Sequence, residues 1–160
     1  MNNPRIRIKM SLFDLIGDII SVGLILTAWI MIVFLWRNLP ATIPSHYDMA
    51  GNIDGYSSKA SILLLPAIMT LAFIGMKIVE FFPGSWNMSV KVTRQNAAKV
   101  YRKSKDVLTM SKMTISTVFF VIFTFAISLK PMPWYVSVGL ILLPFILIIV
   151  MIIRLSINNN

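Results

Sequence analysis

The sequence has 160 residues, of which 57% are hydrophobic and only 13% are charged, and its mean hydropathy is +0.78. A soluble domain carries about 25% charged residues, so this composition excludes a soluble fold and indicates a membrane protein. The net charge of +9 then points to membrane topology and lipid headgroups rather than to nucleic acid. The chain has no cysteine, which excludes disulfides and cysteine-based metal or catalytic sites.

The first predicted element is a membrane-spanning helix over about 15–36. Ser11 is a candidate N-cap, and Asp14 three residues later completes a capping-box pattern. Asp18 lies one helical turn after Asp14 on the same face, near the start of an uncharged run. We expect Asp18 to pair with a basic residue of the inner surface; the alternative is a role in carrying a proton or an ion.

The second element is a polar loop, Leu39 to Lys59, that contains the single histidine and two of the six acidic residues. Asp48 and Asp54 stand beside glycines, where side-chain-stabilised turns belong, and Gly51 and Gly55 can supply positive φ. His46 is expected to hydrogen-bond a neighbouring backbone group. The alternatives are a surface that binds a partner and a divalent-ion site. The candidate ligand-binding or shape-setting residues of the loop are Pro40, Pro44, His46, Asp48, Gly51, Asp54, Gly55 and Lys59.

A second span is predicted over about 60–82, with Ser57 or Ser58 as its cap. Pro66 lies about two turns into this helix and is expected to loosen or kink it. Lys77 and Glu80 are three residues apart near the inner end, so we expect them to form an ion pair.

A strongly basic segment follows over 93–112. Its apolar residues recur at helical spacing, which predicts an amphipathic cytoplasmic helix that either lies along the inner membrane surface or leads straight into the third span. The residues expected to contact lipid headgroups or a cytoplasmic partner protein are Arg94, Lys99, Arg102 and Lys103.

The third and fourth spans are predicted over about 113–129 and 134–153, joined by a tight turn at 130–133. The chain would thus form one four-helix membrane domain over 1–160. Segments 1–10, 83–112 and 154–160 hold eleven Lys or Arg, whereas loops 37–59 and 130–133 hold three. Because cytoplasmic loops collect Lys and Arg, both termini are expected in the cytoplasm and the Leu39–Lys59 loop outside.

Recognisable catalytic motifs are missing from the sequence. It contains no HExxH, GxSxG, P-loop or dinucleotide fingerprint, and one histidine cannot provide a two-histidine zinc site. We therefore expect neither an enzyme nor a cofactor or metal.

The Leu39–Lys59 loop resembles the signature loop of a bacterial membrane domain of unknown function that forms the N-terminal part of SdpI-type immunity proteins. The matching residues are Leu39-Pro40, Ile43-Pro44, His46, Gly51, Asp54-Gly55 and Ser58-Lys59. Residues 83–102 resemble the cytoplasmic loop of that family through Pro83, Trp86-Asn87, Val90-Lys91-Val92-Thr93, Asn96-Ala97 and Tyr101-Arg102.

The resemblance implies a Gram-positive-type plasma-membrane protein that confers resistance to a secreted peptide toxin and holds a transcriptional repressor at the membrane. The leading hypothesis is an immunity, resistance or sensing protein whose outward loop binds an antimicrobial peptide or lipid. The alternatives are an accessory or regulatory subunit, partnered by another protein, and a small transporter.

Overall fold

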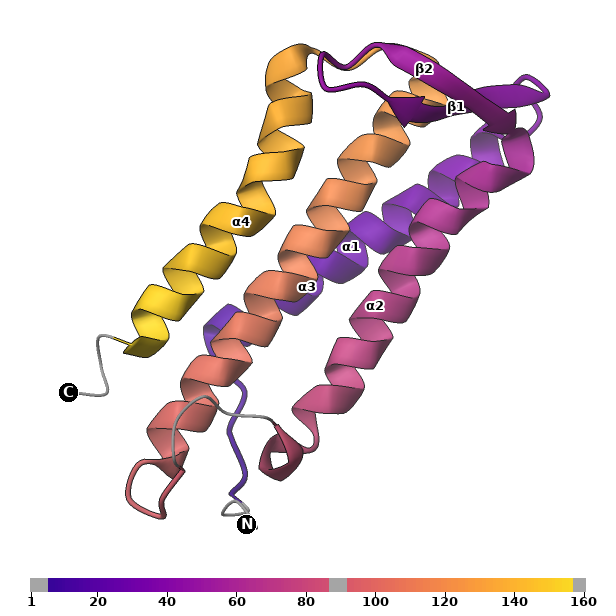
Figure 1. Ribbon diagram of the computed structural model, residues 1–160. Coiled ribbons are helices and arrows are strands. Elements are labelled where there is room, and N and C mark those ends of the chain that lie inside the picture. Colours follow the sequence, from indigo (N-terminus) through magenta and orange to yellow (C-terminus); the bar gives the residue numbers. More distant parts are fainter. Residues whose placement is uncertain (1–5, 87–91, 157–160) are drawn as a thin grey trace.

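The computed structural model describes residues 6–86 and 92–156 and shows long helices with a β-hairpin across one end (Figure 1). Residues 87–91, which belong to the second resemblance, and the tail 157–160 lie outside the described residues, as does Arg5. The four α-helices are α1 (Leu12–Leu35), α2 (Leu64–Glu80), α3 (Ala97–Ser128) and α4 (Trp134–Ser156). The strands are β1 (Thr42–Tyr47) and β2 (Ile53–Ser58), and the 3₁₀ helices are η1 (Lys59–Leu63) and η2 (Pro83–Ser85).

Helix α1 begins as the sequence predicts. The Ser11 side chain accepts a hydrogen bond from the Asp14 N–H at 3.2 Å, and the Asp14 carboxylate accepts one from the Ser11 N–H at 2.9 Å. Two of the N–H groups that have no partner within the helix are satisfied in this way, which fixes the start of the helix.

The start of α2 differs from the prediction. Ser58 precedes η1 but makes no capping bond with its side chain, and the Ser57 hydroxyl instead donates to Ser45 across the hairpin at 2.9 Å. The expected kink two turns into the helix is also wrong. Pro66 lies in the first turn of α2, where a backbone N–H has no acceptor within the helix, so the proline is accommodated there without a lost bond.

Helix α3 unites the basic segment and the third span in one continuous helix of 32 residues, about 48 Å long. A separate amphipathic helix along the membrane surface is therefore wrong, and the alternative that the segment leads straight into the span holds. The helix ends at Leu129, whose φ of 59° is left-handed. Helix α3 is the central element, since α1, α2 and α4 all pack against it (Figure 1).

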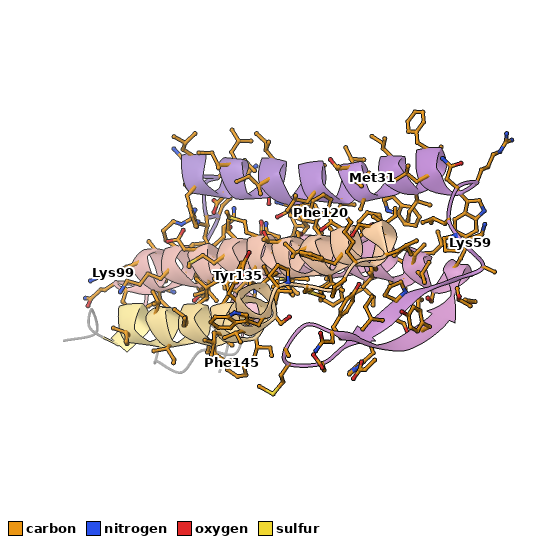
Figure 2. All side chains as sticks on the ribbon, turned by 90° about the horizontal axis from the view of Figure 1, so that it is seen from above. Met31, Lys59, Lys99, Phe120, Tyr135 and Phe145 are labelled. Carbon is orange, nitrogen blue, oxygen red and sulfur yellow. The ribbon has the colours of Figure 1, made fainter. Side chains whose placement is uncertain are left out.

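Three helical segments are long and apolar enough to cross a membrane, namely Leu12–Leu35, Lys59–Glu80 and Ala97–Ser128, and α4 is a further apolar helix. Large apolar side chains project outward from these helices (Figure 2). Phe34 and Leu71, for example, are 77% and 69% exposed. Such outer faces suit lipid, because helices satisfy their own backbone hydrogen bonds there. The chain is consistent with a multi-pass membrane protein.

The loop between α1 and α2 is a two-stranded antiparallel hairpin. The fold is mostly helical, as predicted, but an all-α fold with a structured loop is not the full description, because this segment forms strands. Ile43 of β1 is 1% exposed and joins a core with Ala28 and Ile32 of α1 and Phe123 of α3. Buried β-branched residues favour strands, and here one of them anchors the hairpin to the helix ends. The hairpin is therefore packed against the helix ends through this core.

Candidate functional site

The tip of the hairpin is closed by a short hydrogen-bonded turn. The Asp48 carboxylate accepts hydrogen bonds from the backbone and side-chain N–H groups of Asn52, at 2.8 and 3.1 Å. The Asn52 side chain is the main cause of a lowered pKa for Asp48, and backbone N–H groups add to it. Gly51 has a φ of 86°, so the expected positive φ is confirmed at this glycine.

Gly51 also seats the hairpin tip against the turn between α3 and α4. Its carbonyl accepts a hydrogen bond from the Met132 N–H at 2.8 Å. A Cβ atom at position 51 would lie 2.1 Å from the Met132 carbonyl oxygen. Only glycine fits between the two backbones, which explains this residue better than the turn alone.

The role expected for Gly55 is wrong, because Gly51 is the single glycine of positive φ in the described part of the chain. Gly55 lies opposite His46 at an irregularity of the strand register. A Cβ there would lie 2.9 Å from the Cβ of His46. The glycine leaves room for the histidine, since two side chains cannot occupy this crossing.

His46 contacts a carboxylate and not the backbone group expected from the sequence. Its Nδ1 lies 2.5 Å from Oδ1 of Asp54, and the two side chains are 71% and 45% exposed. The pair exposes one imidazole and one carboxylate on the surface of the hairpin. In the described residues, no group of three His, Asp or Glu gathers as a metal site would require.

Lys59 points away from this pair, toward the end of α1. Its ammonium donates to the carbonyl of Trp36 at 3.1 Å and to that of Leu39 at 3.5 Å, and it lies 4.9 Å from the centroid of the Trp36 ring. A cation over an indole face with carbonyl acceptors is a stabilising contact that ties β2 to α1. Pro44 is buried in β1, and Pro40 lies exposed before it. The predicted loop residues therefore have different roles. His46 and Asp54 form an exposed pair, Asp48 and Gly51 form the turn, and Lys59 ties β2 to α1.

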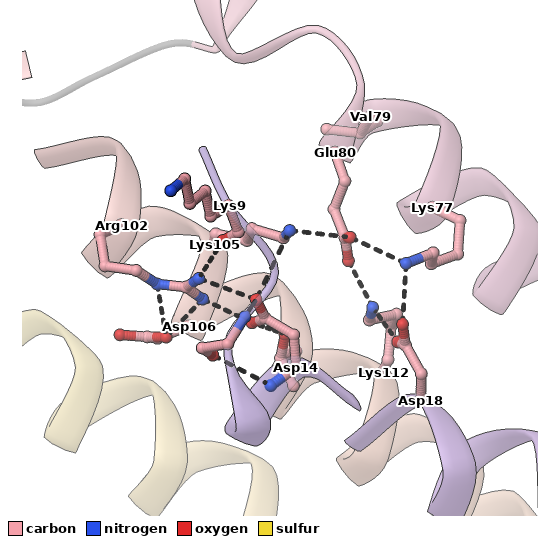
Figure 3. Close-up of polar contacts among 12 residues, drawn as sticks. Lys9, Asp14, Asp18, Lys77, Val79, Glu80, Arg102, Lys105, Asp106 and Lys112 are labelled. Atoms are coloured by element: carbon pink, nitrogen blue, oxygen red, sulfur yellow. Dashed lines mark hydrogen bonds and ion pairs between the residues drawn. The ribbon is translucent and has the colours of Figure 1, made fainter. Parts of the chain in front are cut away.

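At the opposite end of the helices, ionised side chains form a network that the sequence analysis located only in part (Figure 3). Four of them make a closed ring of alternating charge: Asp18 of α1, Lys77 and Glu80 of α2, and Lys112 of α3. Lys77 donates to Asp18 at 2.8 Å and to Glu80 at 3.0 Å, and Lys112 donates to Asp18 at 2.5 Å and also to Glu80. Lys112 is fully buried. The ring joins three helices at one level.

A second cluster continues the network along α3. Arg102 donates two hydrogen bonds to Asp14, at 2.5 and 2.7 Å, and lies 2.7 Å from Asp106. Lys105 lies 3.5 Å from Asp14 and 3.9 Å from Glu80, so it connects this cluster to the ring. The eight side chains of the network comprise four carboxylates and four cations, so their formal charges cancel.

The network confirms two predicted ion pairs and shows a different contact for Arg102. Asp18 pairs with basic residues, and Lys77 pairs with Glu80, as predicted. Arg102, predicted to face lipid headgroups or a partner protein, directs its guanidinium inward to Asp14. Arg94 lies exposed in the turn before α3, Lys99 lies exposed in the first turn of α3, and Lys103 is half-buried.

A signal for the network is present in the sequence. Arg102, Lys105, Thr109 and Lys112 recur at intervals of three and four and share one helical face. Thr109 donates to Asp14 at 3.1 Å from this face. The matching carboxylates on α1 are four residues apart, so one polar stripe faces another across the helix contact.

Residues 23–70 match a family described as "Domain of unknown function (DUF1648)". The match runs from the middle of α1 through the whole hairpin into the first turns of α2. The chain is also similar to an uncharacterized protein of Archaeoglobus fulgidus, 29% identical over 55 residues, which are 34% of this chain and 28% of the relative. No solved structure matches. The similarity is centred on the hairpin, and neither description names an activity.

Proposed function

We propose that this protein is a multi-pass plasma-membrane protein whose β1–β2 hairpin recognises an antimicrobial peptide or lipid on the outer side, in an immunity, resistance or sensing role. Both termini would lie in the cytoplasm. The asymmetry of Lys and Arg supports this orientation, since the basic first half of α3 and the hairpin occupy opposite ends of the molecule (Figure 1).

The observation that carries the proposal is that the hairpin is held firmly yet keeps an exposed face. Ile43 is in the core and Gly51 is bonded to the α3–α4 turn, whereas Tyr56 of β2 is 65% exposed. Connections between packed helices are commonly two to eight residues long. This connection is longer, forms strands, is held in place by Ile43 and Gly51, and exposes polar and aromatic side chains. These features suit the binding of a ligand better than a role as a simple connection between two helices.

The test is protection of a sensitive bacterial strain against a panel of secreted antimicrobial peptides. Expression of the chain should raise the inhibitory concentration of at least one peptide, and Gly51→Ala should reduce that effect by unseating the hairpin. Gly23→Ala is the matched control, because nothing lies within 4 Å of a Cβ at that position. Membrane levels of each variant are measured by immunoblot. Unchanged sensitivity to every peptide, at full expression, would refute the proposal.

The charge network is the observation that favours the second candidate, a small transporter. Its position favours a fixing role instead, because Asp14 lies in the first turn of α1 and Glu80 is the last residue of α2. The uncharged part of α1 after Asp18 is about 26 Å long at 1.5 Å per residue, close to the hydrocarbon thickness of about 30 Å. The ring therefore suits the boundary of the membrane rather than its middle.

An accessory or regulatory subunit is the remaining alternative. The exposed Arg94 and Lys99 would then meet a cytoplasmic partner. Co-purification from native membranes tests this reading, with Arg94→Ala and Lys99→Ala expected to release the partner. A chain that purifies alone would argue against it.

A further inference from the structure

The two edges of the hairpin are not equivalent. The Lys59 N–H donates to the Ala41 carbonyl at 2.8 Å, so this position forms a hydrogen-bonded pair of the antiparallel ladder. Pairs alternate along such a ladder, and the backbone groups of every second residue point away from the partner strand. The pairs whose groups point outward are Thr42–Ser58 and Pro44–Tyr56.

The outer edge of β1 is closed. Pro44 has no N–H to offer at the edge position that it occupies, and prolines on edges prevent further strands from pairing. β1 also packs against α3 and η1. No incoming strand can continue the sheet on this side.

The outer edge of β2 is open. Tyr56 directs its N–H and carbonyl away from β1, and Ser58 directs its N–H away from β1. The Ser58 carbonyl belongs to the start of η1, where the N-cap carbonyl accepts the first hydrogen bond of the helix. Within the described residues β2 packs extensively against β1 alone. Both residues have exposed side chains. An unpaired edge with exposed donors and acceptors is a template for an added strand.

We propose that the outer edge of β2 binds a cationic peptide in extended form, which adds a third strand to the hairpin. This inference rests on the proposed function and names how the ligand is held. Main-chain hydrogen bonds to Tyr56 and Ser58 supply affinity, and side chains on alternate positions supply selectivity.

The charge of the hairpin selects this occupant. From Thr42 to Ser58 the formal charges at neutral pH are the carboxylates Asp48 and Asp54, and the segment contains no Lys or Arg. Tyr56, two residues after Asp54 in β2, exposes an aromatic ring, and the face of such a ring attracts cations. A second copy of the chain would bring a hairpin of the same formal charge, whereas a cationic peptide brings the opposite charge.

The test uses Ser58→Pro, a variant that the hairpin tolerates. Ser58 already has a φ of −58°, close to the angle that proline imposes, and its N–H is not part of the ladder. The substitution removes one outward donor of the edge. Ser58→Ala is the matched control, because it loses the same hydroxyl and keeps the N–H.

The probe is a synthetic heptapeptide of alternating lysine and valine, titrated against the full chain in phosphatidylcholine nanodiscs. We expect saturable binding to wild type and to Ser58→Ala, and binding about tenfold weaker to Ser58→Pro, as for one lost hydrogen bond. A heptapeptide with N-methylated valines should bind about as weakly to wild type. Amide exchange at Tyr56 and Ser58 should slow when the unmodified peptide is bound.

Absence of binding to wild type, or equal binding by Ser58→Pro or by the N-methylated peptide, would overturn the inference. A dimer that Ser58→Pro dissociates would overturn it in favour of self-pairing. Protection of cells that persists unchanged in Ser58→Pro would reject the edge while the proposed function stands. Edge-dependent binding without any protection by wild type would reject the proposed function while the binding edge stands.

Discussion

Replacing Lys112 by methionine tests whether the charge network holds the three helices together. Lys112 is the fully buried cation of the ring and contacts both Asp18 and Glu80. Its loss leaves these two carboxylates with Lys77, while Lys105 remains 3.9 Å from Glu80. Removing one partner from a buried ion pair costs about 3–5 kcal/mol, because the remaining charge stays desolvated and uncompensated. We expect the lower end of this range, about 3 kcal/mol, since Lys77 still serves both acids.

The assay is the free energy of unfolding in mixed micelles, followed by tryptophan fluorescence during titration with SDS. Lys112→Met combined with Glu80→Gln restores charge balance and should recover most of the loss, which a double-mutant cycle reports as coupling. Lys130→Met is the control, since Lys130 is exposed in the α3–α4 turn. A loss for Lys112→Met no larger than that of Lys130→Met, or a double variant less stable than the single, would refute the reasoning.

Three further predictions concern the hairpin and the orientation. Gly51→Ala should speed amide exchange throughout both strands, because a Cβ lies 2.1 Å from a backbone oxygen and φ is 86°; exchange equal to wild type would contradict that packing. In intact cells a membrane-impermeant maleimide should label Tyr56→Cys and leave Lys99→Cys unlabelled, on a chain without native cysteine; the reverse pattern would invert the orientation. The lowered pKa of Asp48 means that its turn contributes stability above the ordinary carboxyl pKa of about 3.9 and loses it as pH falls through the lower folded value. Asn52→Ala should weaken this acid dependence of hairpin exchange, and an unaltered pH profile would count against the Asp48–Asn52 bond as its source.

The sequence was informative wherever the signal is local. Hydropathy marks apolar helices because lipid-facing residues are apolar irrespective of their neighbours, and the capping box of α1 involves residues three apart. Asp48 beside Gly51 predicted a turn, since both act on their own backbone. The pairing of Lys77 with Glu80 was visible because one helical turn brings them together.

Tertiary structure decided what depends on partners distant in sequence. The hairpin requires Ile43 to be buried by α1 and α3, and such packing overrides the turn-forming residues around it. His46 meets Asp54 because the irregular strand register pairs His46 with Gly55, the neighbour of Asp54. Lys112 is buried because α1 and α2 bring two carboxylates to its face of α3. Composition and local patterns predicted the apolar helices, which are long enough to cross a membrane. The pairing of strands and of charges followed from which faces the packed helices bring into contact.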